Sequence, residues 1–227
     1  MTATGVPFSV VLVDLDGTMV DSAPGITSTL AETLVELGLP TPPPSRLLEF
    51  VGPPIMDGFR DVVGLDQEES VRALAVYRAR YRERGAFDAA VYPGVRGALE
   101  AIRATGVPLA VATSKPETQA ERILEHFGLA DLFVVVAGAS DDEVRSEKAD
   151  VITWCLQLLR EAGVDASAPV MVGDRVHDVR GAAVHGIPTL FAGWGYGSPA
   201  EAAGTLGIAD TPDDLPALVA AGRPAAG

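Results

Sequence analysis

The stretch FSVVLVDLDGT, residues 8–18, joins a nearly continuous apolar run to two aspartates. The run does not alternate apolar with polar residues, so it is typical of a strand buried on both faces, as in a parallel sheet covered by helices. We therefore expect a strand over residues 8–13. Asp14 and Asp16 then lie at its carboxyl end, where Gly17 allows the chain to turn and where sheets of this kind bind ligands.

Four later apolar runs have the same character, and they cover residues 108–112, 133–137, 170–172 and 188–191. Most of them are separated by segments with helical spacing of apolar residues, for example the segment that contains Val95, Leu99 and Ile102. Strands that alternate with helices in this way predict an α/β fold with a doubly wound parallel sheet.

The interval between the first two predicted strands is about 90 residues long, far more than one crossover helix needs. Apolar residues share a helical face in two parts of it, and three prolines at positions 42–44 interrupt the chain between them. We expect an α-helical cap domain over residues 22–90, inserted into a core of residues 1–21 and 91–227. A turn at residues 92–95 returns the chain to the core. A last short helix is expected over 212–218, followed by a frayed tail over 223–227.

Composition excludes several classes of protein. With 48% hydrophobic and 21% charged residues, the chain is expected to be globular rather than disordered. Its 17 basic and 31 acidic residues give a net charge of -14, which disfavours binding of nucleic acid polymers. No apolar run reaches the length of a membrane span, and residues 1–7 do not resemble a signal peptide. The single cysteine, Cys155, lies in an apolar helical run and is expected to be buried, so we expect a reducing compartment, the cytoplasm.

Acidic residues follow two of the predicted strands. Two carboxylates about 4 Å apart repel by roughly 4 kcal/mol at an effective dielectric of about 20, so Asp14 and Asp16 need a cation, a shared proton or water. Asp174 follows the run that ends at residue 172, and Asp178 lies one helical turn further on. Together these residues predict a four-carboxylate cluster of hard oxygen ligands, which favours Mg²⁺. Zinc is disfavoured because the three histidines show no ligand spacing and the cysteine is alone.

Hydroxyl and ammonium groups stand at two comparable places. Thr113, Ser114 and Lys115 follow the second predicted strand just ahead of a helix, where they suit a phosphate group, although Ser114 is also explained as a simple helix cap. Lys148 opens the helix after the third strand. Lys115 and Lys148 are the only lysines among 17 basic residues, which suggests that a compact charge is needed at both positions, although codon usage and chance explain it as well.

The predicted cap contains two features that bear on substrate choice. Residues 51–54, Val-Gly-Pro-Pro, form a rigid turn that is able to lean over the site. Arg78, Arg80, Arg82 and Arg84 form a local basic block that would attract an anionic substrate, and Arg78 is our candidate for substrate contact. The alternative is a solvated helix face, because these four positions cannot all face one way on a helix.

Four motifs in this order resemble those of the haloacid dehalogenase superfamily: Asp14-x-Asp16-Gly17-Thr18, then Thr113-Ser114-Lys115-Pro116, then Lys148, then Gly173-Asp174-x-x-x-Asp178. The helical insertion after the first motif resembles the cap of that superfamily. The turn at 92–95 and residues 115–129 resemble its phosphoglycolate phosphatase-like branch. The resemblance covers about residues 10–192 and departs at 140–147, where relatives tend to have a Gly turn before an Arg.

The resemblance implies a role for each matching residue. Asp14 would be the nucleophile that forms an aspartyl-phosphate, and Asp16 the general acid and base. Ser114 and Lys148 would hold the transferring phosphoryl group, and Gly17, Thr18, Thr113 and Lys115 would line the same substrate site. Asp14, Asp174 and the backbone carbonyl of Asp16 would bind Mg²⁺, with Asp178 in support. An acid at position 16 argues against a true dehalogenase.

These features predict a Mg²⁺-dependent phosphatase of small phosphomonoesters, with phosphoglycolate or a nucleoside monophosphate as substrate. The alternatives are a 5'-nucleotidase-type substrate, a phosphosugar mutase of the same fold, and a non-catalytic binding protein. The expected partner is a small phosphorylated metabolite, with no nucleic acid and no membrane, and the chain is expected to be a monomer or homodimer.

Overall fold

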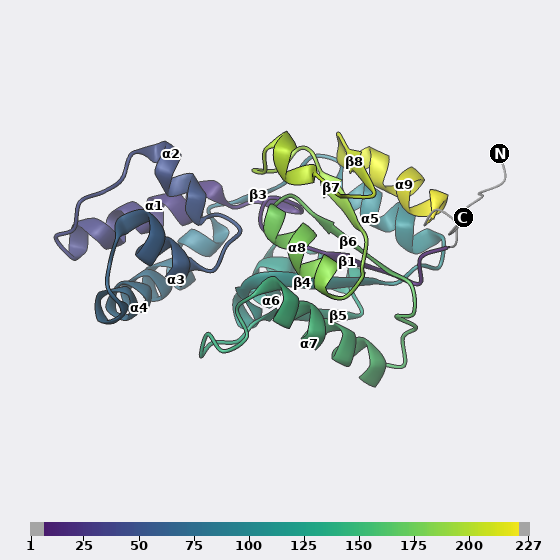
Figure 1. The fold of residues 1–227 in the computed structure, drawn as a ribbon, viewed down its shortest axis with the longest axis horizontal. Coiled ribbons are helices and arrows are strands. Elements are labelled where there is room, and N and C mark those ends of the chain that lie inside the picture. Colours follow the sequence, from purple (N-terminus) through teal and green to yellow (C-terminus); the bar gives the residue numbers. More distant parts are fainter. Residues whose placement is uncertain (1–6, 223–227) are drawn as a thin grey trace.

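The computed structural model describes residues 7–222, and its centre is a six-stranded sheet in which all neighbouring strands are parallel (Figure 1). The strand order is β5-β4-β1-β6-β7-β8. The strands are β1 (Val10–Val13), β4 (Leu109–Pro116), β5 (Val135–Ala139), β6 (Pro169–Gly173), β7 (Thr189–Ala192) and β8 (Gly207–Ala209). The order reverses beside β1, because the chain builds β4 and β5 on one side of it and β6, β7 and β8 on the other. The carboxyl end of β1 is therefore the switch point at which such sheets bind ligands.

The five predicted strands are present, with shifted ends. β4 runs on to Pro116, past an irregularity in its pairing with β5 between Ala112 and Pro116. The edge strand β8 was not expected from the sequence. It has only three residues, and Ile208 at its centre is half exposed, so it lacks the apolar run that marks a buried strand.

Helices cover both faces of the sheet. Alternate residues of β1 serve different layers: Val10 and Leu12 pack toward α7 (Lys148–Glu161) and α8 (Val176–Val184), whereas Val11 and Val13 pack on the opposite side. The opposite layer contains α5 (Val95–Ala104), α6 (Glu117–His126) and α9 (Leu215–Ala221). The doubly wound fold is confirmed, and Cys155 is buried in α7 as expected.

Short 3-10 turns join several core elements. They are η4 (Ala130–Leu132), η5 (Pro199–Ala202) and η6 (Pro212–Asp214). The predicted last helix is thus a 3-10 turn that continues into α9. The tail predicted over 223–227 lies outside the described residues.

A helical body lies beside the carboxyl edge of the sheet, joined to it by a two-stranded antiparallel ribbon of β2 (Val20–Asp21) and β3 (Ala90–Val91) (Figure 1). Its elements are α1 (Ala23–Glu36), α2 (Pro44–Leu47), η1 (Leu48–Phe50), α3 (Ile55–Gly58), η2 (Phe59–Val63), α4 (Gln67–Glu83) and η3 (Gly85–Phe87). The long helix α4 begins with a capping box between Asp66 and Glu69. Within residues 7–222, no helix combines the length and apolar character that crossing a bilayer requires.

Candidate active site

Lys148 is the centre of a buried charge network at the carboxyl end of β1. Its Nζ donates hydrogen bonds to Oδ1 of Asp14 at 2.7 Å and to the carbonyl of Ala112 at 3.0 Å, and it lies 2.7 Å from Oδ1 of Asp178. The ammonium thus donates two hydrogen bonds and forms ion pairs with two buried carboxylates. Burial opposes the charge of Lys148, but the two carboxylates outweigh it and raise its pKa above the ordinary value. The ammonium therefore stays charged beside Asp14.

Three carboxylates share this site. Asp14, Asp174 and Asp178 are all buried, and one oxygen of each lies within 4.8 Å of the others. Burial raises the pKa of Asp14 to about 6, against the attraction of Lys148, and the charge of Asp178 adds to the rise. Burial and the same carboxylate repulsion also raise the pKa of Asp174 well above its usual range. A buried cluster of hard oxygen donors with a surplus of negative charge fits a magnesium ion.

The side chain of Asp16 does not join that cluster. After Asp16 the chain turns at Gly17, whose φ is +80°. The Asp16 carboxylate forms an ion pair with Lys115, with 3.0 Å between Oδ2 and Nζ. Its other oxygen, Oδ1, is buried and has no hydrogen-bond partner among residues 7–222. The structure thus groups three of the four expected carboxylates and directs the fourth toward Lys115.

Asp174 is oriented by the loop at residues 193–197, which was not among the predicted site residues. The backbone N–H of Tyr196 donates to Oδ2 of Asp174 at 2.7 Å, and the hydroxyl of Thr18 donates to Oδ1 at 3.2 Å. Trp194 donates its indole N–H to the carbonyl of Thr18 at 3.0 Å. A Cβ at Gly195 would come within 2.3 Å of the Asp174 Cβ, so only glycine fits there. The run GWGYG at residues 193–197, directly after a predicted strand, was the available signal.

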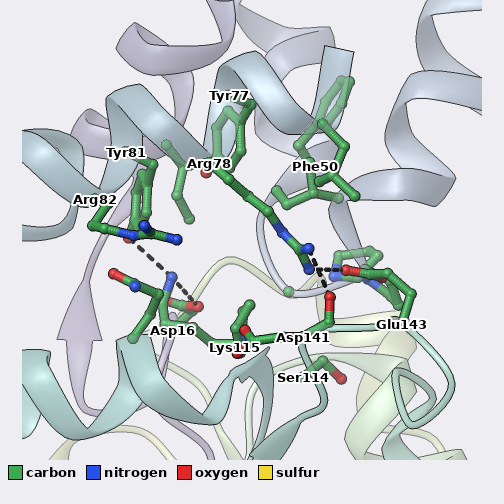
Figure 2. A pocket seen from close by; sticks show the side chains of 18 residues that line it. Asp16, Phe50, Tyr77, Arg78, Tyr81, Arg82, Ser114, Lys115, Asp141 and Glu143 are labelled. Atoms are coloured by element: carbon green, nitrogen blue, oxygen red, sulfur yellow. Dashed lines mark hydrogen bonds and ion pairs between the residues drawn. The ribbon is translucent and has the colours of Figure 1, made fainter. Parts of the chain in front are cut away.

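Ser114, Lys115 and Pro116 of the second motif form the floor of an open pocket beside this site (Figure 2). Lys115 Nζ reaches upward to the hydroxyl of Tyr81 at 2.9 Å, as well as to Asp16. The Thr113 hydroxyl accepts the backbone N–H of Lys115, and Ser114 is half-buried on the pocket floor. Helix α6 begins only after Pro116, without a side-chain cap, so Ser114 is not the helix cap that was the alternative explanation.

The four arginines of the basic block separate into two pairs. Arg80 and Arg84 turn toward α1, where Arg80 pairs with both Glu32 and Glu36, and Arg84 pairs with Glu32. Arg78 and Arg82, one helical turn apart, line the pocket. The expected basic mouth therefore contains only Arg78 and Arg82. The alternative of a solvated helix face does not describe all four residues either.

Two contacts join the helical body to the core at the pocket rim. Arg78 donates to the carbonyl of Asp141 at 2.8 Å and forms an ion pair with Glu143, both in the loop at residues 140–147. On the other side, Arg175 donates to the carbonyl of Val51, in the turn at residues 51–54. That turn lines the pocket through residues 52–54, as its rigid sequence suggested.

Several known proteins are similar in sequence to most of this chain. The chain is 46% identical over 187 residues to the tyrosine-protein kinase PtkA of Mycobacterium tuberculosis, a match that covers 82% of this chain and 62% of that protein. The chain thus spans less than two thirds of the length of that relative. It is 37% identical to a 5'-nucleotidase of Pseudomonas aeruginosa, over 84% of this chain and 85% of that protein. It is 34% identical to a plasmid-encoded phosphoglycolate phosphatase of Cupriavidus necator, over 98% of each.

Solved structures share the same architecture. A predicted phosphatase from Clostridium acetobutylicum superposes with a TM-score of 0.87 at 35% identity, and the match covers 93% of this chain and 98% of that one. The sequence profile of the haloacid dehalogenase-like hydrolases matches residues 11–192, which include all four motifs. The chain therefore belongs to the haloacid dehalogenase-like hydrolase family.

Proposed function

We propose that this protein is a Mg²⁺-dependent phosphatase that hydrolyses small phosphomonoesters through an aspartyl-phosphate on Asp14. The observation that carries the proposal is the position of Asp14 between Lys148 and two further buried carboxylates, with Asp16 beside an open pocket. The family membership and the phosphatases among the relatives support it.

Asp14 acts as the nucleophile. In the first step a bond forms between a carboxylate oxygen of Asp14 and phosphorus, and the bond between phosphorus and the ester oxygen breaks. Lys148, held 2.7 Å from Asp14, keeps that carboxylate ionised and oriented, and stabilises the charge on the phosphoryl oxygens. Ser114, on the pocket floor, donates to another phosphoryl oxygen.

Asp16 transfers the proton. It protonates the leaving oxygen in the first step. In the second step it takes a proton from the water that attacks phosphorus, the bond between phosphorus and the Asp14 oxygen breaks, and inorganic phosphate leaves. This role needs a carboxyl group that faces the leaving group. The Asp16 side chain meets that need, because it lies on the pocket side of the turn and not in the carboxylate cluster.

The side chains of Asp14 and Asp174 and the backbone carbonyl of Asp16 would hold Mg²⁺, with Asp178 in support. Bound there, the ion would offset the surplus of buried negative charge and would supply a Lewis acid for the phosphate oxygens. Thr18 and the 193–197 loop keep Asp174 in place, so Thr18 contributes through the metal site. Residues 22–90 are proposed to act as the cap that closes over the substrate, with β2 and β3 as its connection to the core.

The test is the release of inorganic phosphate from a panel of phosphomonoesters, with Mg²⁺ and with excess chelator. Rapid acid quenching followed by mass spectrometry should show a phosphoryl adduct on the peptide that contains Asp14. Phosphate release without that adduct would contradict the mechanism. Conversion of a sugar 1-phosphate to the 6-phosphate without free phosphate would identify a mutase instead. The absence of any phosphoryl transfer would favour the alternative of a non-catalytic binding protein.

A further inference from the structure

One wall of the pocket is built of aromatic side chains that support each other. The rings of Tyr77 and Tyr81 are stacked, with centroids 5.4 Å apart and planes at 16°. Phe59 packs edge-on against Tyr77 at 6.5 Å and against Phe50 at 5.6 Å. Tyr77, Tyr81 and Phe50 line the pocket, and each is at least 96% buried. These contacts hold the wall in place before any ligand arrives, so an apolar ring that reaches its exposed edge packs there without ordering mobile side chains.

This wall lies close to the reacting groups. Lys115 Nζ is 2.9 Å from the Tyr81 hydroxyl and 3.0 Å from the Asp16 carboxylate. Figure 2 shows the dashed contacts that run from Tyr81 through the Lys115 ammonium to Asp16. Only these two short contacts separate the wall from the group that protonates the leaving oxygen. The part of a substrate that occupies this space is thus the leaving group, and further apolar lining comes from Ile26, Pro54, Ile55 and Leu74.

The charged groups of the pocket interior already have partners. Lys115 is paired with Asp16, and Arg78 is paired with Glu143 and with the carbonyl of Asp141. Among the described lining residues, Arg82 is the cation with no carboxylate within 4 Å, and it lies exposed at the mouth. A carboxylate on the leaving group would lose its water beside Asp16 and Glu143 without gaining a free cation.

We propose that this pocket selects phosphomonoesters whose leaving group carries an uncharged, flat, apolar ring, in preference to carboxylate-bearing esters such as phosphoglycolate. This inference rests on the proposed phosphatase activity and specifies its substrate class. Tyr77 and Phe50 determine the selectivity through ring packing, and the ion pair between Arg78 and Glu143 excludes carboxylates. The ring is either bonded close to the ester oxygen or separated from it by a sugar, and the pocket chemistry is shared by both.

The first experiment measures kcat/KM of the wild-type protein with Mg²⁺ for benzyl phosphate, adenosine 5'-monophosphate, glycerol 1-phosphate and 2-phosphoglycolate. All four release an alcohol, so the intrinsic leaving ability of the group does not favour the ring as it would in a phenyl ester. At least one ring-bearing ester should exceed 2-phosphoglycolate by about 10-fold or more. The benzyl and adenosine arms distinguish a ring near the ester from one behind a sugar. A preference for 2-phosphoglycolate overturns the inference and leaves the phosphatase proposal intact.

A binding measurement keeps the inference testable if none of the esters is hydrolysed, a result that would contradict the proposed activity. Benzylphosphonate and phosphonoacetate are compared by calorimetry with the Mg²⁺-loaded protein. Tighter binding of benzylphosphonate supports the aromatic subsite, and equal or weaker binding overturns it.

Two pairs of variants test the residues. Tyr77→Leu should lower the ratio of ring-bearing ester to 2-phosphoglycolate by roughly 3- to 10-fold, whereas Tyr77→Phe, which keeps the ring, should retain it. Glu143→Gln leaves Arg78 without its carboxylate and should lower KM for 2-phosphoglycolate, whereas the exposed control Glu83→Gln should not. A ratio unchanged in Tyr77→Leu, or a KM for 2-phosphoglycolate unchanged in Glu143→Gln, overturns the assignment of that residue.

Discussion

Tyr196 joins Asp174 to the connection between core and helical body. Its backbone N–H donates to Asp174 at 2.7 Å, while its side-chain hydroxyl donates to Asp21 at 2.6 Å and accepts the backbone N–H of Ala23 at 2.9 Å. Asp21 ends β2, and Ala23 begins α1. One residue thus contacts both a candidate metal ligand and the hinge of the proposed cap.

The two functions of Tyr196 are separable by mutation. Tyr196→Phe removes only the hydroxyl, so it should destabilise the protein by about 1–3 kcal/mol and leave Mg²⁺ affinity within about two-fold of wild type. Gly195→Ala instead places a methyl group against Asp174 and should weaken Mg²⁺ binding. Urea unfolding and Mg²⁺ titration by calorimetry measure both effects. A large loss of Mg²⁺ affinity in Tyr196→Phe would contradict this separation.

Mg²⁺ should stabilise the protein through the carboxylate cluster. At a concentration 100-fold above its Kd the ion should add about 2.7 kcal/mol, which corresponds to a rise in Tm of roughly 5–10 °C. Asp174→Asn should reduce that rise strongly, because it removes one of three clustered oxygens. The exposed residue Asp131 provides the matched control, Asp131→Asn. Differential scanning calorimetry with Mg²⁺ or chelator is the measurement, and equal shifts in both variants would refute the site.

Asp14→Asn should abolish phosphate release and leave the circular dichroism spectrum unchanged, because an amide is nearly the same shape but a poor nucleophile. Retention of more than about 1% of the wild-type turnover would refute the nucleophile assignment, because loss of a covalent nucleophile costs orders of magnitude in rate.

The same variant reports on the pH dependence of stability. The folded protein raises the pKa of Asp14 from 3.8 to about 6, so it holds this proton more tightly than the unfolded chain does. In excess chelator, the contribution of Asp14 to stability should therefore fall as pH rises from about 4 to 6, by up to about 3 kcal/mol. Asp14→Asn has no carboxyl group to titrate at this position, so this loss of stability should be absent in the variant. Urea unfolding of both proteins between pH 4 and 7 measures the difference, and parallel pH profiles would contradict the raised pKa.

Lys148→Ala should depress kcat/KM for all phosphomonoesters by a similar factor, of about 100-fold or more, because Lys148 acts on the phosphoryl group that they share. It leaves two buried carboxylates without their cation and should also cost about 3–5 kcal/mol in metal-free protein.

Arg78→Ala should instead change the relative rates of different esters, because Arg78 lines the leaving-group pocket. A matrix of kcat/KM values for the Lys148 and Arg78 variants over several esters tests this division. The division would be contradicted if Arg78→Ala changed kcat/KM for all esters by one common factor. It would also be contradicted if Lys148→Ala changed the order of preference among the esters.

The sequence alone determined the architecture and the motifs. Nearly continuous apolar runs such as residues 8–13 predicted strands covered on both faces, because the strands of a parallel sheet between two helical layers are buried on both sides. Asp14, Lys148 and Asp174 were identifiable because each follows a predicted strand or opens the next helix, and Asp178 because it lies one helical turn after Asp174. The edge strand β8 was not predicted, because its three residues carry no apolar pattern. Their pairing with β7 along one side stabilises the strand.

Only the tertiary structure decided which of these groups meet. Asp14 and Asp16 are two residues apart, just past the end of β1 at Val13, yet the Asp14 carboxylate pairs with Lys148 and the Asp16 carboxylate pairs with Lys115. The pairing of Arg78 with Glu143 joins residues 65 positions apart, and the hold of Tyr196 on Asp174 depends on a loop whose glycines allow close approach. Such contacts depend on side-chain direction and on packing between distant segments, which local periodicity does not encode.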